Sequence, residues 1–293
     1  MKIVILGSGG RLGAAIARSY TELGDEIVGF NHRQLDLGDA DALRAALRPL
    51  EFDVLINSAA LTNVDYCESH QEEAMAVNAT AVGIVGEICA RRGARCLHIS
   101  TDYVFDGAQT APYREEDAAI PISIYGASKK AGEDALLAAS ERHLAVRVSW
   151  VFGPDRPSFV DGVLNRALEH EHAEAIADKR AVPTYTADVA QLLRPFLNDV
   201  PEGGLLHRCN GGDCRWQEYG QFAIDCAVAE GVPMKARTVA PLAMADLKSF
   251  IARRPPYTVM ATEKLTWLTG ARPRSWEAAV EEYVRECWAA GKR

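Results

Sequence analysis

The sequence has a deficit of positive charge and no long hydrophobic run at its start. Its 32 lysine and arginine residues are outnumbered by 40 aspartate and glutamate residues, so the net charge is -8. A field of this sign repels nucleic acid and anionic lipid, and we therefore expect neither as a partner. The opening MKIVILGSGG lacks a signal-peptide cleavage region, and its apolar run is far shorter than the roughly 20 residues of a membrane span. We expect a cytoplasmic protein without a membrane partner.

Cysteine pairs, internal repeats and low-complexity segments are also missing. The seven cysteines form an odd set without a CxxC motif, which argues against a disulfide framework and a zinc site. Hydrophobic residues make up 48% of the chain and charged residues 25%, which is typical of a globular protein and excludes a disordered one. Because the 293 residues exceed the common domain size of about 100 to 200, we expect one large domain and a smaller one.

Apolar runs and helical patterns alternate along the first half of the chain. The expected strands are 2–6, 26–30, 53–56, 94–100 and 144–149, and the expected helices between them include 39–47, 72–91 and 125–140. Strands that are continuously apolar are buried on both faces, as in a parallel sheet covered by helices. The pattern predicts an α/β fold with a Rossmann-type doubly wound parallel sheet.

The pattern loosens after Phe152, where proline and glycine turns separate shorter helices and loops. A helix near 187–197 and a strand near 205–209 are expected to return to the sheet. We therefore predict an NAD(P)-binding Rossmann domain formed by residues 1–150, with 184–208 returning to it. The predicted substrate-binding region comprises residues 151–183 and 209–293.

Three glycines follow the first expected strand. Gly7, Gly10 and Gly13 form a GxxGxxG pattern between that strand and a helix. Without side chains, the backbone can turn sharply and approach a pyrophosphate, whose charge meets the amides of the helix N-terminus. A plain strand-to-helix turn is the alternative, but the flanking strand and helix are the context that a dinucleotide loop requires. We expect Arg11 and Leu12 to line the same site.

The end of the second strand differs from that of a typical NAD site. An acidic residue usually binds the adenosine ribose there, whereas this chain reads Asn31-His32-Arg33. A cation suits a 2'-phosphate, so NADPH is the expected cofactor and NADH the alternative. A solvated surface turn is the other interpretation of these residues. The remaining expected cofactor contacts are Asp36 and Leu37 on this turn, and Ala59 and Ala60 after the third strand.

A tyrosine and a lysine stand four residues apart on the expected helix 125–140. Tyr125 and Lys129 therefore share one helix face and address the same small volume. A free phenol has a pKa of about 10, so a tyrosine that transfers a proton near neutral pH needs a stabilised phenolate. The Lys129 ammonium would supply that stabilisation and would also hold the nicotinamide ribose. A YxxxK pattern alone, however, also arises by chance on exposed helices.

Hydroxyl side chains stand at the end of the fourth expected strand. Ligands bind at the carboxyl edge of a parallel sheet, where Thr101, or Ser100 as the second choice, can hydrogen-bond a reacting oxygen. The third strand ends in Asn57-Ser58-Ala59-Ala60, which offers no carboxylate pair for hydrolysis. Small residues there allow a cofactor to approach closely.

Several longer segments carry a family resemblance. They are DVLINSAALTNVD (53–65), STDYVFDG (100–107), IYGASKKAGE (124–133), RVSWVFG (147–153), VPTYTADVA (182–190) and RRPPYTVMATEKL near the C-terminus. In content and order they resemble the dTDP-4-dehydrorhamnose reductase family of the extended short-chain dehydrogenase/reductase superfamily, over essentially the whole chain.

The resemblance implies an NADPH-dependent reduction of the 4-keto group of a nucleotide-sugar substrate, dTDP-4-dehydro-L-rhamnose, to dTDP-L-rhamnose. Tyr125 would protonate the carbonyl oxygen while the nicotinamide delivers hydride, with Lys129 and Thr101 in support. The sugar site that the resemblance implies is lined by Thr62, Val64, Asp102, Tyr103 and Trp150. Both aromatic residues suit a sugar face but could equally be core residues. We expect a monomer or a homodimer.

Two segments require separate interpretation. Where the family usually reads Asp-Gln before its Pro-Thr motif, this chain has Lys179 and Arg180 after an aspartate, and these cations either bind substrate phosphates or face solvent. His170 and His172 stand two apart on an expected helix and would point away from each other, unlike a metal pair at i and i+4. We expect no metal.

Three alternative functions stay open. A reductase of the same family could act on another nucleotide-linked keto-deoxysugar, and the sequence separates the two poorly. A noncatalytic NADP-binding regulatory subunit, like that of methionine adenosyltransferase, would keep the fold, but it would not require Thr101, Tyr125 and Lys129 together. The STDYVFDG and VPTYTADVA segments argue against an epimerase or dehydratase.

Overall fold

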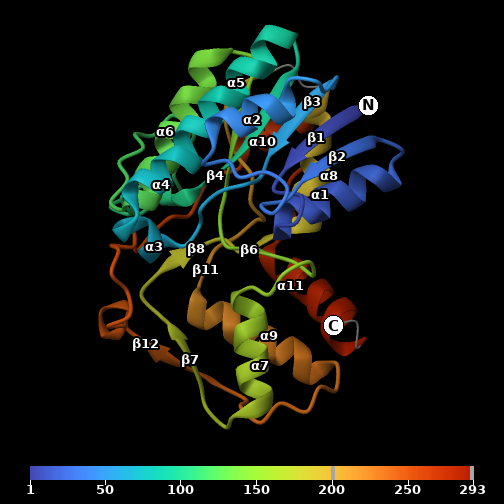
Figure 1. Ribbon diagram of the computed structural model, residues 1–293. Helices are drawn as coiled ribbons and strands as arrows, with labels where there is room; N and C mark the ends of the chain where they lie inside the picture. Colours follow the sequence, from blue (N-terminus) through green and yellow to red (C-terminus); the bar gives the residue numbers. More distant parts are fainter. Residues whose placement is uncertain (199–201, 291–293) are drawn as a thin grey trace.

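The computed structural model describes residues 1–198 and 202–290. Figure 1 shows two lobes, with a sheet covered by helices above and a smaller group of helices and short strands below. The N-terminus lies in the upper lobe, which we call the sheet lobe, and the lower one is the small lobe.

The sheet lobe is built on six parallel strands in the order β10-β5-β4-β3-β1-β2. Their bounds are β1 Lys2–Leu6, β2 Glu26–Phe30, β3 Val54–Asn57, β4 Arg95–Thr101, β5 Leu144–Val148 and β10 Gly204–His207. The order reverses at β1, because β2 lies on one side of it and β3 on the other. Such a reversal opens a crevice at the carboxyl ends of the strands. The predicted doubly wound α/β fold is confirmed.

Helices cover both faces of the sheet. One face carries α1 (Arg11–Glu22) and α8 (Thr186–Leu193), which pack on each other through Ile16, Val189 and their neighbours. The other face carries α2 (Ala40–Leu47), α5 (Ala81–Arg92) and α6 (Ile124–Ala139). Because each face has its own buried apolar cluster, the strands between them are mainly hydrophobic.

The expected helix 72–91 is interrupted. It consists of α4 (Gln71–Met75), a π-helical turn η1 (Ala76–Thr80) and α5. The whole run Gln71–Arg92 is long and apolar enough to cross a membrane by composition, but 56% of its most apolar window is buried inside the protein. Its contacts with α6 mark it as a core helix of the sheet lobe.

The small lobe has a separate aromatic core. Its main helices are α7 (Phe159–Glu169), α9 (Trp216–Ala229) and α11 (Trp276–Tyr283), and β7 (Ala173–Ile176) pairs in parallel with β12 (Val239–Leu242). The shorter elements of the two lobes together are α3 Val64–Ser69, η2 Asp102–Val104, β6 Val151–Phe152, β8 Arg180–Ala181, β9 Thr184–Tyr185, η3 Arg194–Leu197, β11 Cys214–Arg215, η4 Met244–Asp246, α10 Glu263–Thr269 and η5 Val284–Ala289.

The chain passes more than once between the lobes. Strand β10 pairs with β5 in the sheet, and α10 packs beside β10 with Leu265 in the sheet-lobe core. Part of the segment 209–293 therefore supports the sheet lobe, although α9 and α11 belong to the small lobe. We retain the division into a cofactor domain and a substrate-binding region as a proposal.

The prediction that His170 and His172 lie on a helix is wrong. Helix α7 ends at Glu169, and His170 follows in extended backbone (φ -125°, ψ 154°). Both histidines are exposed near the start of β7. Among the described residues, no group of three or more histidine, cysteine, aspartate or glutamate side chains is placed to hold a metal ion.

Candidate active site

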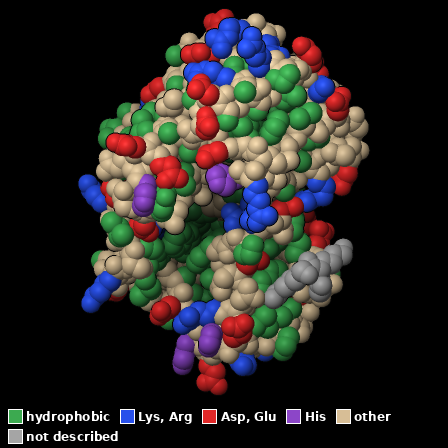
Figure 2. Space-filling view, viewed as in Figure 1, with side chains coloured by type: hydrophobic (Ala, Val, Ile, Leu, Met, Phe, Trp, Pro, Cys, Tyr) green, Lys and Arg blue, Asp and Glu red, His purple; other side chains and the backbone are tan. Residues whose placement is uncertain are grey.

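A cleft of about 1560 Å³ lies at the carboxyl ends of the sheet strands. Figure 2 shows the molecule hollowed between the lobes, with hydrophobic side chains inside the hollow. Ligand pockets commonly measure about 300 to 1,000 Å³, so this cleft has room for a dinucleotide and a second ligand. The predicted site residues that line it are Gly7, Gly10, Arg11, Leu12, Asn31, His32, Arg33, Asp36, Leu37, Ala59, Ala60, Thr62, Val64, Thr101, Asp102, Tyr103, Tyr125, Lys129 and Trp150.

The glycine loop brings α1 close to the sheet. Gly7 has a φ of +82°, and a Cβ there would lie 2.7 Å from the Ala59 amide nitrogen. Gly13 is not in the cleft lining, but a Cβ at this residue would lie only 2.2 Å from the Gly7 carbonyl oxygen. Gly10 precedes the helix, whose N-terminus has no side-chain cap and no acidic residue in its first turn. The uncapped amides suit an anion such as a pyrophosphate.

The turn after β2 presents His32 and Arg33 to the cleft. Asn31 Oδ1 accepts hydrogen bonds from the backbone nitrogens of Arg33 (3.0 Å) and Gln34 (3.2 Å), so the asparagine shapes the turn. His32 and Arg33 are exposed at the cleft. Asp36 Oδ1 accepts from the Gly38 nitrogen at 2.9 Å.

Arg11 has a role that its sequence position did not reveal. Its guanidinium donates to the carbonyl oxygens of Val151 (3.2 Å), Arg156 (3.0 Å) and Pro157. Burial lowers the pKa of this group. Arg11 lines the cleft and also ties the start of α1 to the segment that leads into the small lobe.

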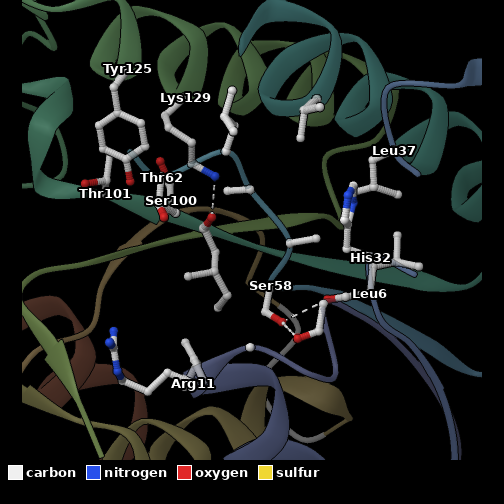
Figure 3. Close-up of a pocket in the computed structure, with 18 of the residues that line it drawn as sticks. Leu6, Arg11, His32, Leu37, Ser58, Thr62, Ser100, Thr101, Tyr125 and Lys129 are labelled. Carbon is white, nitrogen blue, oxygen red and sulfur yellow. Dashed lines mark hydrogen bonds between the residues drawn. The ribbon is translucent and has the colours of Figure 1, made fainter. Parts of the chain in front are cut away.

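Tyr125 lies in the first turn of α6, where Ser123 caps the helix by accepting a hydrogen bond from the Gly126 nitrogen. Thr101 is the last residue of β4 and faces it, as Figure 3 shows. Burial raises the pKa of the Tyr125 phenol, and a hydrogen bond with Thr101 opposes this rise. The two hydroxyls therefore form one polar unit in a mainly apolar surrounding.

Lys129 lies one helical turn below Tyr125. Its ammonium donates to the Ile99 carbonyl oxygen at 2.7 Å and lies 3.0 Å from His98 Nε2. Burial lowers the pKa of Lys129 to about 7, while the charge of Glu133 opposes the change. We expected this ammonium to stabilise the phenolate, but the group that lowers the Tyr125 pKa here is the Thr101 hydroxyl.

Ser100, the second choice for orienting the substrate, is engaged elsewhere. Its hydroxyl donates to Glu133 Oε1 at 2.6 Å, and the Arg147 guanidinium holds the same carboxylate through bonds of 2.7 and 2.8 Å. Both ion-pair side chains are 1% exposed. This buried pair joins β4, β5 and α6 directly beneath Tyr125 and Lys129.

The π-helical turn η1 supplies another support. Asn78 accepts a hydrogen bond from the Leu61 nitrogen at 2.8 Å and donates to the Leu61 carbonyl and to Ser128 Oγ, each at 3.0 Å. It thereby joins the loop after β3 to α6. Neither Asn78 nor Glu133 was selected from the sequence, because their partners are distant along the chain.

Asp102 lines the cleft beside Thr101, although its side chain is almost fully buried. It accepts hydrogen bonds from Thr101 Oγ1 (3.1 Å), Ser149 Oγ (3.0 Å) and Thr258 Oγ1 (2.5 Å). Burial raises the pKa of its carboxyl group, and the charge of Lys179 opposes this. The carboxylate thus orients the Thr101 hydroxyl.

Both interpretations offered for Lys179 are wrong. It neither faces solvent nor lines the cleft, because its side chain is fully buried with Nζ 4.7 Å from the Tyr103 ring centre and 2.6 Å from the Pro255 carbonyl oxygen. Burial lowers the pKa of Lys179 to about 8, and Asp102 opposes this. Arg180 pairs with Asp213.

The two aromatic residues of the predicted sugar site line the cleft and also pack against other aromatic rings. Trp150 lines the cleft, and its ring lies 5.3 Å from Trp216 and 6.4 Å from Tyr219 in the small-lobe core. Its φ of +40° is rare for a residue other than glycine, and such strain concentrates at functional sites. Tyr103 is buried edge-on to Tyr125, with ring centres 5.6 Å apart.

A doubly wound sheet, a glycine loop at its switch point and a Thr-Tyr-Lys group across the same cleft define an oxidoreductase of the short-chain dehydrogenase/reductase class. The RmlD substrate binding domain family matches residues 1–288, and the chain belongs to that family.

Similar proteins and structures match this chain over nearly its whole length. The dTDP-4-dehydrorhamnose reductase of Mycobacterium tuberculosis H37Rv is 35% identical, over 95% of this chain and 91% of that enzyme. The spore coat polysaccharide biosynthesis protein SpsK of Bacillus subtilis 168 is 31% identical, over 97% of each chain. The crystal structure of dTDP-4-dehydrorhamnose reductase from Bacillus anthracis Ames in complex with NADP has a TM-score of 0.89 at 28% identity, and covers 97% of this chain and 99% of that one.

Proposed function

We propose that this enzyme reduces the 4-keto group of a nucleotide-linked 6-deoxyhexose with NADPH, and that its substrate is dTDP-4-dehydro-L-rhamnose. The observation that carries the proposal is the pairing of Tyr125 with Thr101 in the same cleft as an uncapped helix N-terminus and a cationic turn. The names of its relatives support the choice of sugar.

The residues present fit a dinucleotide phosphate. The contacts that Gly7 and Gly13 make leave no space for side chains, so the loop lies against β3 and exposes backbone amides. The turn after β2 carries Arg33 where an NAD site would carry an acid, and this supports NADPH, with NADH as the alternative. When bound, the cofactor supplies the hydride that the carbonyl carbon accepts.

Tyr125 is suited to donate a proton to the carbonyl oxygen. Since burial raises the pKa of its phenol, the group is protonated at neutral pH and ready for the reductive direction. Thr101 shares this hydrogen-bonding unit, and Asp102 orients the threonine hydroxyl from behind. We infer that Tyr125 donates to the carbonyl oxygen, and that the Thr101 hydroxyl, whose one proton here goes to Asp102, turns that proton to the same oxygen when the substrate binds.

Lys129 would hold the ribose next to the nicotinamide. An ammonium has three N–H donors, of which the Ile99 carbonyl and His98 Nε2 account for two. His98 accepts because burial and the neighbouring lysine lower its pKa well below the usual value and keep the imidazole neutral. The third donor is left for a ribose hydroxyl.

The test is oxidation of NADPH and of NADH by the purified enzyme, followed through the absorbance of the reduced nicotinamide, with dTDP-4-dehydro-L-rhamnose generated in a coupled reaction. Substrate-dependent oxidation with dTDP-L-rhamnose as the product is expected. Tight NADPH binding without oxidation would contradict the proposed sugar and favour another keto-sugar or the regulatory role. A cytoplasmic location and a monomeric or homodimeric state remain our expectations.

A further inference from the structure

We propose that Arg156, from the segment leading into the small lobe, binds the 2'-phosphate of NADPH opposite Arg33. The inference rests on the proposed use of NADPH and adds a residue that the sequence did not suggest. With Arg156 included, residues from both lobes would contact the cofactor.

The segment 151–157 is firmly anchored to α1. Arg11 donates to three of its carbonyl oxygens, at Val151, Arg156 and Pro157. Arg18 forms a two-bond ion pair with Asp155, with distances of 2.5 and 3.1 Å. The segment is thus held by the same helix whose N-terminus faces the glycine loop, and the position of Arg156 relative to that loop is set by these contacts.

The Arg156 side chain reaches the glycine loop. Its Nε donates to the Gly9 carbonyl oxygen at 2.8 Å. A Cβ built on Gly9 would lie 3.1 Å from Asn31 Cβ and 4.0 Å from Arg156 Nη2, so the guanidinium lies on the side of the loop that faces the turn after β2. Arg33 belongs to that turn and lines the cleft together with Arg156.

Donor geometry favours a phosphate as the ligand. A guanidinium has five N–H donors, and the bond to Gly9 uses the one on Nε. The two terminal nitrogens therefore keep a planar fork of donors, which matches two phosphate oxygens. Asp155 is neutralised by Arg18, so it does not cancel the charge of Arg156. Arg33 and Arg156 thus place two positive charges at the cleft of a protein whose net charge is -8.

The position favours the 2'-phosphate over the pyrophosphate. A pyrophosphate belongs at the helix N-terminus, beside the amides that follow Gly10. Arg156 instead contacts Gly9, where an added Cβ would lie 3.1 Å from the Cβ of Asn31, directly after β2. The adenosine ribose of a bound dinucleotide lies at the end of that strand. Arg33 and Arg156 would then bind the 2'-phosphate from two sides.

The experiment measures NADPH and NADH dissociation constants by titration calorimetry on the full-length chain, without sugar substrate. Removing a charge-assisted bidentate contact in Arg156→Gln should weaken NADPH binding about tenfold. NADH binding should stay within about twofold, because NADH lacks the 2'-phosphate. Arg156→Lys should retain part of the NADPH affinity, since it keeps the charge but not the fork.

Two further variants sharpen the result. The double variant of Arg33→Gln and Arg156→Gln should bring the NADPH and NADH constants close together. The control Arg166→Gln changes an exposed arginine on α7 that does not line the cleft, and should leave both constants unchanged.

Equal weakening of NADPH and NADH by Arg156→Gln would overturn the proposal and place the arginine at the pyrophosphate. Unchanged NADPH binding would overturn it as well. Both outcomes are distinct from failure of the proposed function, in which the unmodified chain would bind neither cofactor or would not oxidise NADPH with the keto-sugar.

Discussion

At one end of the cleft the cations are exposed, and at the other they are buried. Arg33 and Arg156 stand in solvent beside the glycine loop. Lys129 is 1% exposed beneath Tyr125, and Lys179 is 0% exposed behind Asp102. An exposed guanidinium keeps its charge at every physiological pH and can recognise an anion directly. A buried ammonium has a pKa near neutrality, about 7 for Lys129 and about 8 for Lys179, so its charge depends on what binds beside it.

The interactions that hold the cleft also differ between its exposed end and its buried end. The exposed end is shaped by glycines such as Gly13 and by the hydrogen bonds that the Asn31 side chain accepts from backbone nitrogens. The buried end is held by charged side chains, chiefly the ion pair of Glu133 and Arg147. Recognition at the first end thus depends on close backbone approach, and chemistry at the second depends on buried charge.

The largest effect should come from the proton donor at the buried end. Tyr125→Phe removes only the phenol hydroxyl, and loss of a general acid lowers turnover by about 10² to 10⁴-fold. NADPH binding should be retained, because the glycine loop is untouched. Steady-state kinetics measures the turnover and calorimetry the NADPH affinity of the same preparation, so that the two effects are separated. Turnover within a few-fold of the unmodified enzyme would remove Tyr125 from the proposed mechanism.

The next largest effect concerns the ion pair beneath the site. Glu133→Gln leaves the Arg147 guanidinium buried without its carboxylate, which typically costs about 3 to 5 kcal/mol of unfolding free energy. Asp134→Asn is the matched control, because it breaks the exposed pair with Lys130 on the same helix and should cost at most about 1 kcal/mol. Urea denaturation measures the unfolding free energy of both variants. Similar losses in the two variants would show that burial does not distinguish these pairs.

A smaller effect is expected at the exposed end. In Gly13→Ala the new methyl group would meet the Gly7 carbonyl oxygen at 2.2 Å and force α1 away from the loop. We expect NADPH to bind about 10 to 100-fold more weakly, a loss of about 1.4 to 2.8 kcal/mol. Gly162→Ala is the control, since a Cβ there meets nothing within 4 Å on α7, and it should stabilise the fold by about 0.5 to 1 kcal/mol. Unchanged NADPH affinity in Gly13→Ala would argue against close loop packing.

The smallest effect is a proton taken up with the cofactor. Lys129 has a pKa of about 7 without cofactor, so it is mainly neutral at pH 8. A bound dinucleotide adds negative charge nearby and raises this pKa, and binding at pH 8 should therefore take up as much as about one proton. Calorimetry in two buffers of different ionisation enthalpy measures this uptake, which should be lost in Lys129→Met. Release of a proton when the unmodified chain binds NADPH would contradict the expected rise of the Lys129 pKa.

Local sequence patterns predicted much of this structure. The buried strands β1, β3, β4 and β5 were found within one or two residues, because a strand covered on both faces is mainly apolar, even though β4 and β5 also carry the buried His98 and Arg147. The spacing of four predicted that Tyr125 and Lys129 share one face of a helix, and both lie on α6 and line the cleft. The helix expected at His170 was wrong, since α7 stops at Glu169 before an extended segment.

Residues whose partners lie far along the chain could not be assigned in this way. Lys179 was expected to bind phosphate or face solvent, but its partners Asp102, Tyr103 and Pro255 are more than 70 positions away. Arg11 was assigned to the cofactor, and its bonds to the segment 151–157 depend on how the small lobe sits.

By itself, the sequence determined the alternation of buried strands and helices, the glycine loop and the shared helix face of Tyr125 and Lys129. These features follow from periodicity and from backbone sterics, which act over a few residues. Only the tertiary structure decided which cations are buried and which stay exposed, and thus which lysines have pKa values near neutrality. Burial is a property of all the elements that surround a side chain, and no local pattern contains it.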